Sequence, residues 1–425
     1  MNSVFNLPIS TFLVLPISII AFGVLLMIIV FIHEYGHFSM ARMLGVRVDV
    51  FSIGFGKPIL RWVDKKQTEW RISLLPLGGY VKFFGDLNAA SQADPQINKE
   101  EAAEAHPVTT QFPRPGGKKD AARAMTPEER AVCFHFKPVW ARSLIVAAGP
   151  VANFILAVFI FAGLFMMLGR PATDPVIGQV VPDSAAYEAG FEPGDRIVSA
   201  NGRDVPTFQS LSDTIIVSGG REIEFVVQRG DALLTLRAAP LRVVSEDRYG
   251  NEIERWLLGV SPDPNAVSFK KFGPFAALGE GVSELARVLS ITVQYLGRII
   301  AGQENADQLG GPIKMTQYAG QSVMSGFDGS SYAEPPSFVT MLKGSLVDFI
   351  HLAAVVSVSI GFLNLLPVPV LDGGHLVYYA YEAVAGKPLG PKAQAFGFRI
   401  GVVLLASLML FVTWNDINNL LSSLS

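Results

Sequence analysis

The stretch Thr11–His37, TFLVLPISIIAFGVLLMIIVFIHEYGH, decides the fold, because a long apolar run leads directly into ionisable side chains. Residues 1–32 contain no Asp, Glu, Lys or Arg, and Thr11–Ile32 is long enough to cross a bilayer as a helix of about 20 residues. The run lacks the basic start and the small-residue cleavage site of a signal peptide. We therefore predict that residues 1–45 hold a transmembrane helix that stays in the chain.

Three further uncharged runs predict more transmembrane helices, at Ser143–Leu168, Phe349–Leu371 and Ile400–Asn415. The last run reaches full length when it is extended back to Phe396, with the Arg399 side chain directed toward the membrane interface. Of the 425 residues, 50% are hydrophobic and only 17% are charged, against about 25% charged residues in soluble domains. The mean hydropathy is +0.37. The expected fold class is a polytopic α-helical membrane protein with about four transmembrane helices.

Charge and cysteine content exclude several other classes of protein. The formal net charge of −3 provides no basic footprint for nucleic acid, so no nucleic-acid partner is expected. The single cysteine, Cys133, excludes an internal disulfide and a cysteine-rich zinc cluster. The lipid bilayer is the partner that the composition predicts.

Basic residues near the ends of the apolar runs predict their orientation. The segment between the first two runs carries six of them, Arg42, Arg47, Lys57, Arg130, Lys137 and Arg142. The segment after the second run has Arg170 and Lys343 near the membrane. By the positive-inside rule, residues 43–140 lie in the cytoplasm, residues 170–345 lie outside, and both termini lie outside.

The residues on the cytoplasmic side divide into two segments. Residues 46–86 are expected to form a membrane-associated β-rich loop, with strands at Val46–Ile53, Glu69–Leu75 and Tyr80–Phe84. Residues 87–138 are expected to form a cytoplasmic loop, of which the Ala-, Glu-, Pro- and Gln-rich part, 87–128, is predicted to be mostly disordered. The second transmembrane helix then occupies residues 139–170.

Residues 171–262 are predicted to form a compact inserted α+β domain outside the membrane. The pattern predicts strands and one helix at Val176–Val181, Arg196–Ala200, Phe208–Val217 (the helix), Ile223–Gln228 and Leu233–Arg237, followed by a hairpin-like stretch at Leu241–Val260. Residues 263–345 carry an amphipathic helix from Phe275 to Ile299 and a connecting region. Residues 346–425 hold the third and fourth apolar runs.

The motif His33-Glu34-Tyr35-Gly36-His37 continues the first helix and predicts a metal site. Histidines four residues apart share one face of a helix, so both imidazoles can reach one metal ion, with Glu34 beside them as candidate general base. Ionisable groups at membrane depth are costly and usually functional. The alternative interpretation is a pair of interfacial histidines at the end of a transmembrane helix.

A catalytic zinc ion needs a third protein ligand and leaves its fourth position for water. The other intramembrane acid is Asp372, in Asn364–His375, NLLPVPVLDGGH. The first and third runs both cross from outside to inside, and they end at His33–His37 and at Asp372, so both deliver polar groups to the cytoplasmic side. Asp372 is therefore the predicted third ligand. As alternatives, Asp372 is a turn residue before two glycines, or His375 competes with it as the ligand.

Together these motifs resemble the site-2 protease family of intramembrane zinc metalloproteases, specifically its bacterial regulator-of-sigma-E protease branch. The matching stretches are His33–His37, Ser52–Gly56, Leu74–Lys82, Ala148–Phe154, Gly310–Ile313 and Asn364–His375. The resemblance implies that His33, His37 and Asp372 bind Zn2+ and that Glu34 is the catalytic base.

The resemblance also implies how substrate is bound. Asn364 would bind and orient the substrate backbone, and Gly54 and Gly56 would lie in a membrane-reentrant β-loop that contacts substrate. A transmembrane substrate is a helix and must unwind before cleavage. An exposed strand edge near Ser52–Gly56 is expected to capture the unwound segment by strand addition.

The function implied by the resemblance is regulated intramembrane proteolysis in a stress response. Expected substrates are single-span membrane proteins, namely an anti-sigma factor already cut on its outer side, or remnant signal peptides. The implied location is the bacterial inner membrane, with periplasmic termini and the zinc site near the cytoplasmic side.

The outer domain resembles a PDZ domain in its circularly permuted bacterial form. The matching stretch is Pro182–Asp195, followed by Ile197 and Asn201–Gly202. The resemblance implies that this periplasmic domain binds peptide or protein C-termini by strand addition. Well-known members of the branch carry two such domains in tandem, whereas this sequence has one clear copy. The alternative is a lid without any peptide ligand.

Two other functions make predictions that differ from those of a protease. A PDZ-bearing membrane chaperone or adaptor with a structural zinc site predicts no loss of function when Glu34 is replaced. A transporter predicts charged residues along several spans and an internal repeat, and the sequence has neither. The complete set of three ligands and Glu34 favours the protease.

Overall fold

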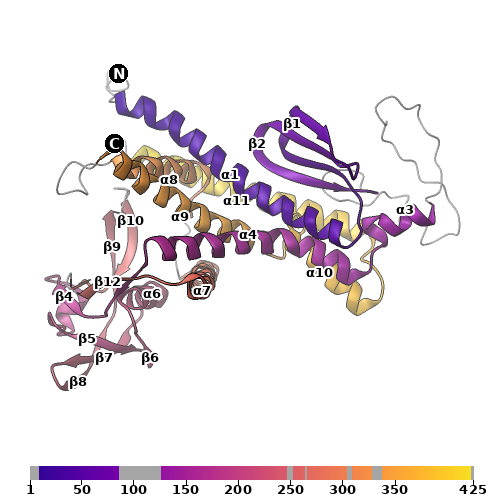
Figure 1. Cartoon of the computed structure of the whole chain (residues 1–425). Coiled ribbons are helices and arrows are strands. Elements are labelled where there is room, and N and C mark those ends of the chain that lie inside the picture. The colour runs from indigo at the N-terminus through magenta and orange to yellow at the C-terminus, as the bar shows by residue number, and fades with distance from the viewer. Residues whose placement is uncertain are drawn as a thin grey trace. The chain divides into compact units, whose positions relative to one another are not determined.

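A computed structural model of the chain describes residues 9–85, 126–246, 252–263, 266–303, 309–327 and 337–422 (Figure 1). Four of its helices are long and apolar enough to cross a membrane, as the sequence predicts. They are α1 (Ile9–Met43), α4 (Val139–Met167), α9 (Phe338–Asn364) and α11 (Pro391–Ser422). These helices are consistent with a polytopic membrane protein.

The third apolar run is not one continuous helix. Helix α9 ends at Asn364, and α10 (Asp372–Ala385) begins only after the loop 365–371. Pro367 and Pro369 lie in this loop; a proline has no backbone N–H, and it disfavours helical geometry in the residue before it. The prediction that Asp372 lies at the end of the third span is therefore wrong, because Asp372 is the first residue of the next helix.

The chain divides into two compact units. The first consists of Met1–Ala157, Met315–Gly320 and Val355–Thr413, and the second of Val158–Lys314, Gln321–Ala354 and Trp414–Ser425. The histidine motif and Asp372 both belong to the first unit, whereas the predicted outer domain belongs to the second.

Two long, bent strands of the first unit, β1 (Val48–Val63) and β2 (Glu69–Phe83), lie beside α1 (Figure 1). Residues 48–53 pair with 79–83 and also lie beside 69–72, while 55–63 pair with 69–75. The two strands predicted at Glu69–Leu75 and Tyr80–Phe84 are thus one continuous strand, which ends at Phe83. Gly54 and Gly78, with φ of 83° and 106°, let each strand bend without ending.

An aromatic cluster joins these strands to α1. The ring centroid of Phe51 lies 5.3 Å from that of Phe38 in α1 and 4.5 Å from that of Trp70 in β2. Phe51 is fully buried. Burial of such large rings stabilises the contact by a few kcal/mol, about 1.5–3 per fully buried side chain, and so fixes β1 and β2 against the helix that carries the histidine motif.

The end of the stretch predicted to be disordered is ordered. Helix α3 (Pro127–Val132) begins at Thr126, whose side chain forms a reciprocal capping box with Glu129. The short helix η1 (Phe134–Phe136) follows, and Phe134 stacks on Phe83 with centroids 4.8 Å apart. Disorder is thus wrong for residues 126–128, because a capping box satisfies the first N–H groups of the helix. Residues 87–125 lie outside the described residues.

The second unit contains the predicted strands and helix of the inserted α+β segment. A sheet of order β6-β5-β7-β8 is formed by β5 (Arg196–Ala200), β6 (Arg203–Asp204), β7 (Ile223–Arg229) and β8 (Ala232–Ala238). Helix α6 (Phe208–Ser218) packs on it through Leu211, which is fully buried with Phe225 of β7. The alternation of apolar residues in β7 and β8 explains why the sequence predicts these elements closely.

Further strands surround that sheet within the second unit. Strand β4 (Ile177–Val180) precedes the short helix α5 (Ala185–Glu188) and pairs with β11 (Val260–Pro262). Strands β9 (Leu241–Glu246) and β10 (Glu252–Leu257) form the expected hairpin. The pairing of β3 (Arg170–Thr173) with β12 (Val267–Lys270) is not predicted by the sequence analysis, because each strand is only four residues long.

The amphipathic helix α7 (Pro274–Ile300) is present as predicted and makes charged contacts within the second unit. Arg287 hydrogen-bonds Asp213 of α6 at 3.1 Å and also pairs with the buried Glu284. Arg170 pairs with the same glutamate. Helix α8 (Pro312–Met324) follows. At its start, the backbone N–H groups of Gly311, Ile313 and Lys314 donate hydrogen bonds to the carboxylate of Asp416 in α11.

Candidate metal centre

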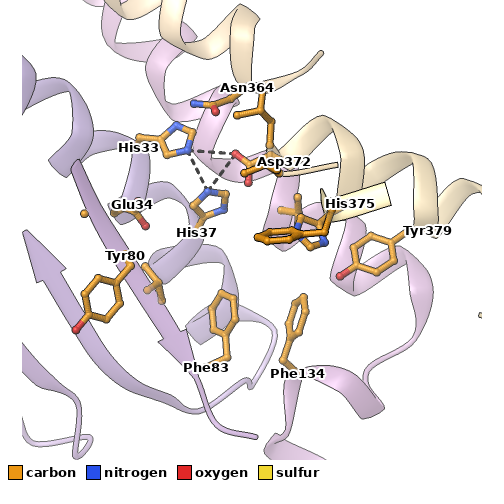
Figure 2. A pocket seen from close by; sticks show the side chains of 16 residues that line it. His33, Glu34, His37, Tyr80, Phe83, Phe134, Asn364, Asp372, His375 and Tyr379 are labelled. Atoms are coloured by element: carbon orange, nitrogen blue, oxygen red, sulfur yellow. Dashed lines mark hydrogen bonds and ion pairs between the residues drawn. The ribbon is translucent and has the colours of Figure 1, made fainter. Parts of the chain in front are cut away.

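Three side chains from two helices converge in the first unit (Figure 2). His33 and His37 lie one turn apart on α1, and their Nε2 atoms are 3.3 Å apart. Asp372 Oδ2, at the start of α10, is 3.2 Å from Nε2 of His33 and 3.4 Å from Nε2 of His37. Both histidines are buried. The sequence-predicted ligands are thus brought to one point.

The donor set and its spacing fit a zinc ion. Ligand atoms about 2.0–2.1 Å from tetrahedral zinc lie about 3.3 Å from one another, which is the spacing of these three atoms. Asp372 Oδ2 is buried and makes no hydrogen bond of ordinary geometry. Two imidazoles and one carboxylate are a typical set for catalytic zinc and leave a fourth position open. In the described part of the chain this is the one group of this kind that could hold a metal ion.

The loop before α10 places Asp372. A β-carbon on Gly373 would lie 2.3 Å from the carbonyl oxygen of Leu365, and one on Gly374 would lie 2.3 Å from that of Val368. Both glycines are buried, so α10 starts in direct backbone contact with the loop. The two glycines after the aspartate are therefore required by packing, and this close contact fixes where the carboxylate lies.

Helix α4 supports the side of each imidazole that faces away from the other ligands. His37 Nδ1 lies 2.9 Å from the backbone oxygen of Ile145, and His33 Nδ1 lies 3.3 Å from Nδ2 of Asn153. Asn153 lies in the matching stretch Ala148–Phe154, for which no role is predicted. A signal was present, because Asn153 is the only polar side chain between Leu144 and Leu168.

Strand β2 positions Glu34. The backbone N–H of Val81 donates a hydrogen bond to the Glu34 carboxylate. A β-carbon on Gly79 would lie 3.0 Å from Cγ of Glu34, so the strand passes close to this side chain. Glu34 lies beside the three converging side chains rather than among them (Figure 2), as a base acting on water would.

A cavity of about 300 Å³ opens beside these groups. Its lining includes Glu34, Tyr80, Asn364, His375 and Tyr379, together with the three converging side chains (Figure 2). Asn364, the last residue of α9, thus faces the same space as the candidate base. The cavity gives an extended peptide room to approach both.

The predicted glycines of the β-loop lie elsewhere. Gly54 and Gly56 are at the bend of β1 and are not among the described residues that line the cavity. Ser52 is fully buried and lies between two neighbouring segments of β2, opposite both Tyr80 and Arg71. The exposed strand edge expected near Ser52–Gly56 therefore does not include residues 52–53, which are interior to the sheet. Residues 79–83 have one strand neighbour in the described part of the chain, and Gly79, Tyr80, Val81 and Phe83 line the cavity.

One surface of the β-loop shows acid–base pairing outside the helices. Burial alone would raise the pKa of Asp64. Hydrogen bonds from Arg42, Trp70 and the backbone of Thr68 and Lys66 have the larger, opposite effect and lower the pKa to about 2. Asp64 therefore remains ionised at neutral pH and ties the β1–β2 turn to Arg42 at the end of α1.

Comparison with known proteins bears on this arrangement. The family model described as peptidase family M50 matches residues 21–408. A protein of Agrobacterium fabrum named "putative zinc metalloprotease" is 41% identical over 405 residues, covering 95% of this chain and 96% of the relative. The metalloprotease MmpA of Caulobacter vibrioides is 39% identical over 407 residues, covering 96% of each.

A solved structure also has a limited similarity to this chain. It is the PDZ domain of an SdrC-like protein from Listeria monocytogenes, with 18% identity and a TM-score of 0.17. The match covers 23% of this chain and 95% of that domain.

Proposed function

This chain belongs to peptidase family M50, the site-2 protease family, and is a membrane metalloprotease; we propose that it is a zinc endoprotease that cleaves single-span membrane proteins by regulated intramembrane proteolysis. The observation that carries the proposal is the meeting of His33, His37 and Asp372 beside Glu34 at one cavity. A carboxylate next to such a centre can act on water while the other three groups hold the metal.

The chemistry divides between the metal and Glu34. His33, His37 and Asp372 would hold a zinc ion, which when bound would make a water more acidic, from a pKa of 15.7 to about 7, and would polarise a peptide carbonyl. Glu34 accepts a proton from the water whose oxygen attacks the scissile carbonyl carbon. It then donates that proton to the amine as the C–N bond breaks. The Val81 N–H that hydrogen-bonds the Glu34 carboxylate keeps it directed at the cavity.

Substrate binding is proposed to use the strand edge that lines the cavity. A transmembrane helix satisfies its carbonyl groups internally, so the scissile segment has to unwind and find new partners. The edge of β2 at 79–83 supplies backbone groups for strand addition. Asn364 faces the same space and would hydrogen-bond the substrate backbone. Gly54 and Gly56 would act indirectly, by allowing the bend that brings β1 and β2 together.

The proposal extends to location and to the outer domain. We infer an inner-membrane protein with residues 43–140 in the cytoplasm and residues 171–262 as a single periplasmic PDZ-like domain. The positive-inside rule supports the orientation, and the described strands around α6 support the domain. Its proposed ligands are peptide or protein C-termini. The proposed substrates are a pre-cleaved anti-sigma factor or remnant signal peptides.

The test compares purified wild-type protein with Glu34→Gln on a single-span reporter, with products identified by mass spectrometry. Cleavage should fall by about 10²–10⁴-fold, because general acid–base catalysis contributes that much. Glu188→Gln is the matched control: it makes the same change on the exposed α5 and should cleave normally. Membrane peptides that accumulate in a Glu34→Gln strain would identify natural substrates. Wild-type cleavage by Glu34→Gln would instead favour a chaperone or adaptor with a structural metal.

A further inference from the structure

Asn153 is fully buried and is the only polar side chain in the stretch 144–167 of α4. Its side-chain nitrogen lies 3.3 Å from Nδ1 of His33, which is labelled in Figure 2. Its side-chain oxygen is buried without a hydrogen bond. We propose that Asn153 is a positioning residue that holds His33 in the tautomer able to bind zinc. The proposal rests on the zinc site proposed above.

The geometry decides which nitrogen of His33 has to be free. Nε2 is the atom that faces His37 and Asp372. A neutral imidazole carries one proton, and a nitrogen that binds a metal must offer a lone pair, so the proton has to be on Nδ1. That N–H points to the amide of Asn153 and needs an acceptor there, since an unpaired buried donor is unfavourable by about 1–3 kcal/mol.

The Asn153 amide can meet this need by rotation. Its oxygen and nitrogen exchange places when the amide turns by about 180°, and they are assigned from their hydrogen-bond partners. With Nδ2 toward the ring, the amide donates to Nδ1, and the His33 proton sits on Nε2, facing Asp372. With Oδ1 toward the ring, the amide accepts the Nδ1 proton, and Nε2 is free. Only the second arrangement leaves Nε2 free for a metal ion, so it is the metal-binding arrangement.

His37 is held by a different kind of group. Its Nδ1 donates to the backbone oxygen of Ile145 at 2.9 Å, and a carbonyl oxygen can only accept. The tautomer of His37 is therefore fixed by backbone, whereas that of His33 depends on one side chain. The backbone oxygen of Asn153 separately accepts a hydrogen bond from Ser357 of α9 at 2.9 Å. Substitution of the side chain leaves this backbone bond in place.

The experiment measures zinc dissociation constants for the full chain in detergent, by competition with a chromophoric chelator. Asn153→Leu should weaken zinc binding by about 10–100-fold, as loss of a hydrogen bond to a ligating histidine typically does. Asn153→Ala removes the amide without adding bulk and should show a similar loss. Asn153→Asp keeps an acceptor oxygen and should bind zinc about 10-fold more tightly than Asn153→Ala does. Circular dichroism and thermal unfolding check that each variant is folded.

A second background separates the tautomer from packing. In His33→Ala there is no imidazole to orient, so adding Asn153→Leu or Asn153→Ala should change the residual zinc affinity by no more than about twofold, the usual limit of additivity. An equal loss in both backgrounds would show that Asn153 acts through helix packing and would overturn the proposal. Asn153→Asp binding as weakly as Asn153→Ala would also overturn it. Wild-type protein that binds no zinc would refute the proposed metal site itself, which is a distinguishable result.

Discussion

Gly149 of α4 lies so close to His37 that a β-carbon at this position would come within 2.2 Å of the Nε2 atom. Gly36 on α1 has the reciprocal role, since its β-carbon would lie 2.3 Å from the carbonyl oxygen of Ala148. Glycine within a helix costs about 0.5–1 kcal/mol relative to alanine. Here the absence of a side chain lets the helices approach and leaves room for the imidazole of His37.

Gly149→Ala should therefore displace the His37 ring and weaken zinc binding by at least about 10-fold, the lower bound for disturbing a ligand's support. Gly163→Ala is the matched control in the same helix, because no atom lies within 4 Å of its β-carbon position. The control should retain zinc and gain up to about 1 kcal/mol of stability. Bound zinc and melting temperature are the measurements. Equal zinc affinity in the two variants would contradict this account.

The proposed division of roles between ligands and base predicts different metal contents. Purified wild-type protein should hold about one zinc ion per chain. Asp372→Asn and His33→Ala each alter a ligand and should lose most of the metal, whereas Glu34→Gln should retain it. Elemental analysis by mass spectrometry measures the ratio directly. Loss of zinc from Glu34→Gln to the same extent would assign Glu34 to the metal instead of to the water.

The proposed orientation can be tested with a membrane-impermeant maleimide. Cys133 is fully buried, so it should react only after denaturation and cannot report orientation alone. Glu128→Cys and Asp231→Cys place thiols at exposed positions in α3 and in the β7–β8 turn. In sealed spheroplasts Asp231→Cys should label and Glu128→Cys should not, while both should label after lysis. The reverse pattern would invert the proposed topology.

The ion pair between Arg229 and the buried Asp195 predicts acid sensitivity in the second unit. Burial alone would raise the pKa of Asp195. Two hydrogen bonds from Arg229, at 2.7 and 2.8 Å, and one from the backbone of Glu192 outweigh this effect and hold the pKa below its usual value of 3.8. Because the folded pKa is lowered, this stabilisation is complete above the unfolded pKa and is lost as the pH falls through the folded pKa. The protection of residues 190–200 against hydrogen exchange, corrected for the intrinsic pH dependence of amide exchange, should therefore fall below about pH 4.

Asp195→Asn removes the charge and should speed exchange of the same residues at neutral pH. The expected loss is about 2 kcal/mol, typical of hydrogen bonds to a charged group, or a roughly 30-fold increase in opening. Asp231→Asn makes the same change on an exposed residue and should leave exchange unaltered. An unchanged exchange rate in Asp195→Asn would show that Arg229 does not stabilise the fold through this carboxylate.

The sequence predicts most of the helical architecture for clear reasons. Four long uncharged runs correspond to α1, α4, α9 and α11 because membrane spans need continuous apolar length. The strands of the second unit follow from their alternating pattern. The third run misleads, because hydropathy continues through 365–371 although Pro367 and Pro369 end the helix. Its length alone therefore placed Asp372 on the wrong element.

The convergence of distant residues could be predicted only in part. The spacing of His33 and His37 reveals that they share a helix face, and Asp372 follows from the need for a third ligand. Asn153 has no such spacing signal, because its partner is 120 positions away in the chain. The interior position of Ser52 depends on how β1 and β2 bend and pair twice, which local patterns do not encode.

The division of the proposed metal ligands between α1 and α10 has a consequence for synthesis of the protein. His33 and His37 enter the membrane with the first helix, whereas Asp372 is made more than 300 residues later. At usual translation rates this interval lasts on the order of tens of seconds. During it the chain holds only two of the three proposed ligands. The proposed zinc site therefore cannot be complete until α10 has been made, and the ribosome itself sets the delay.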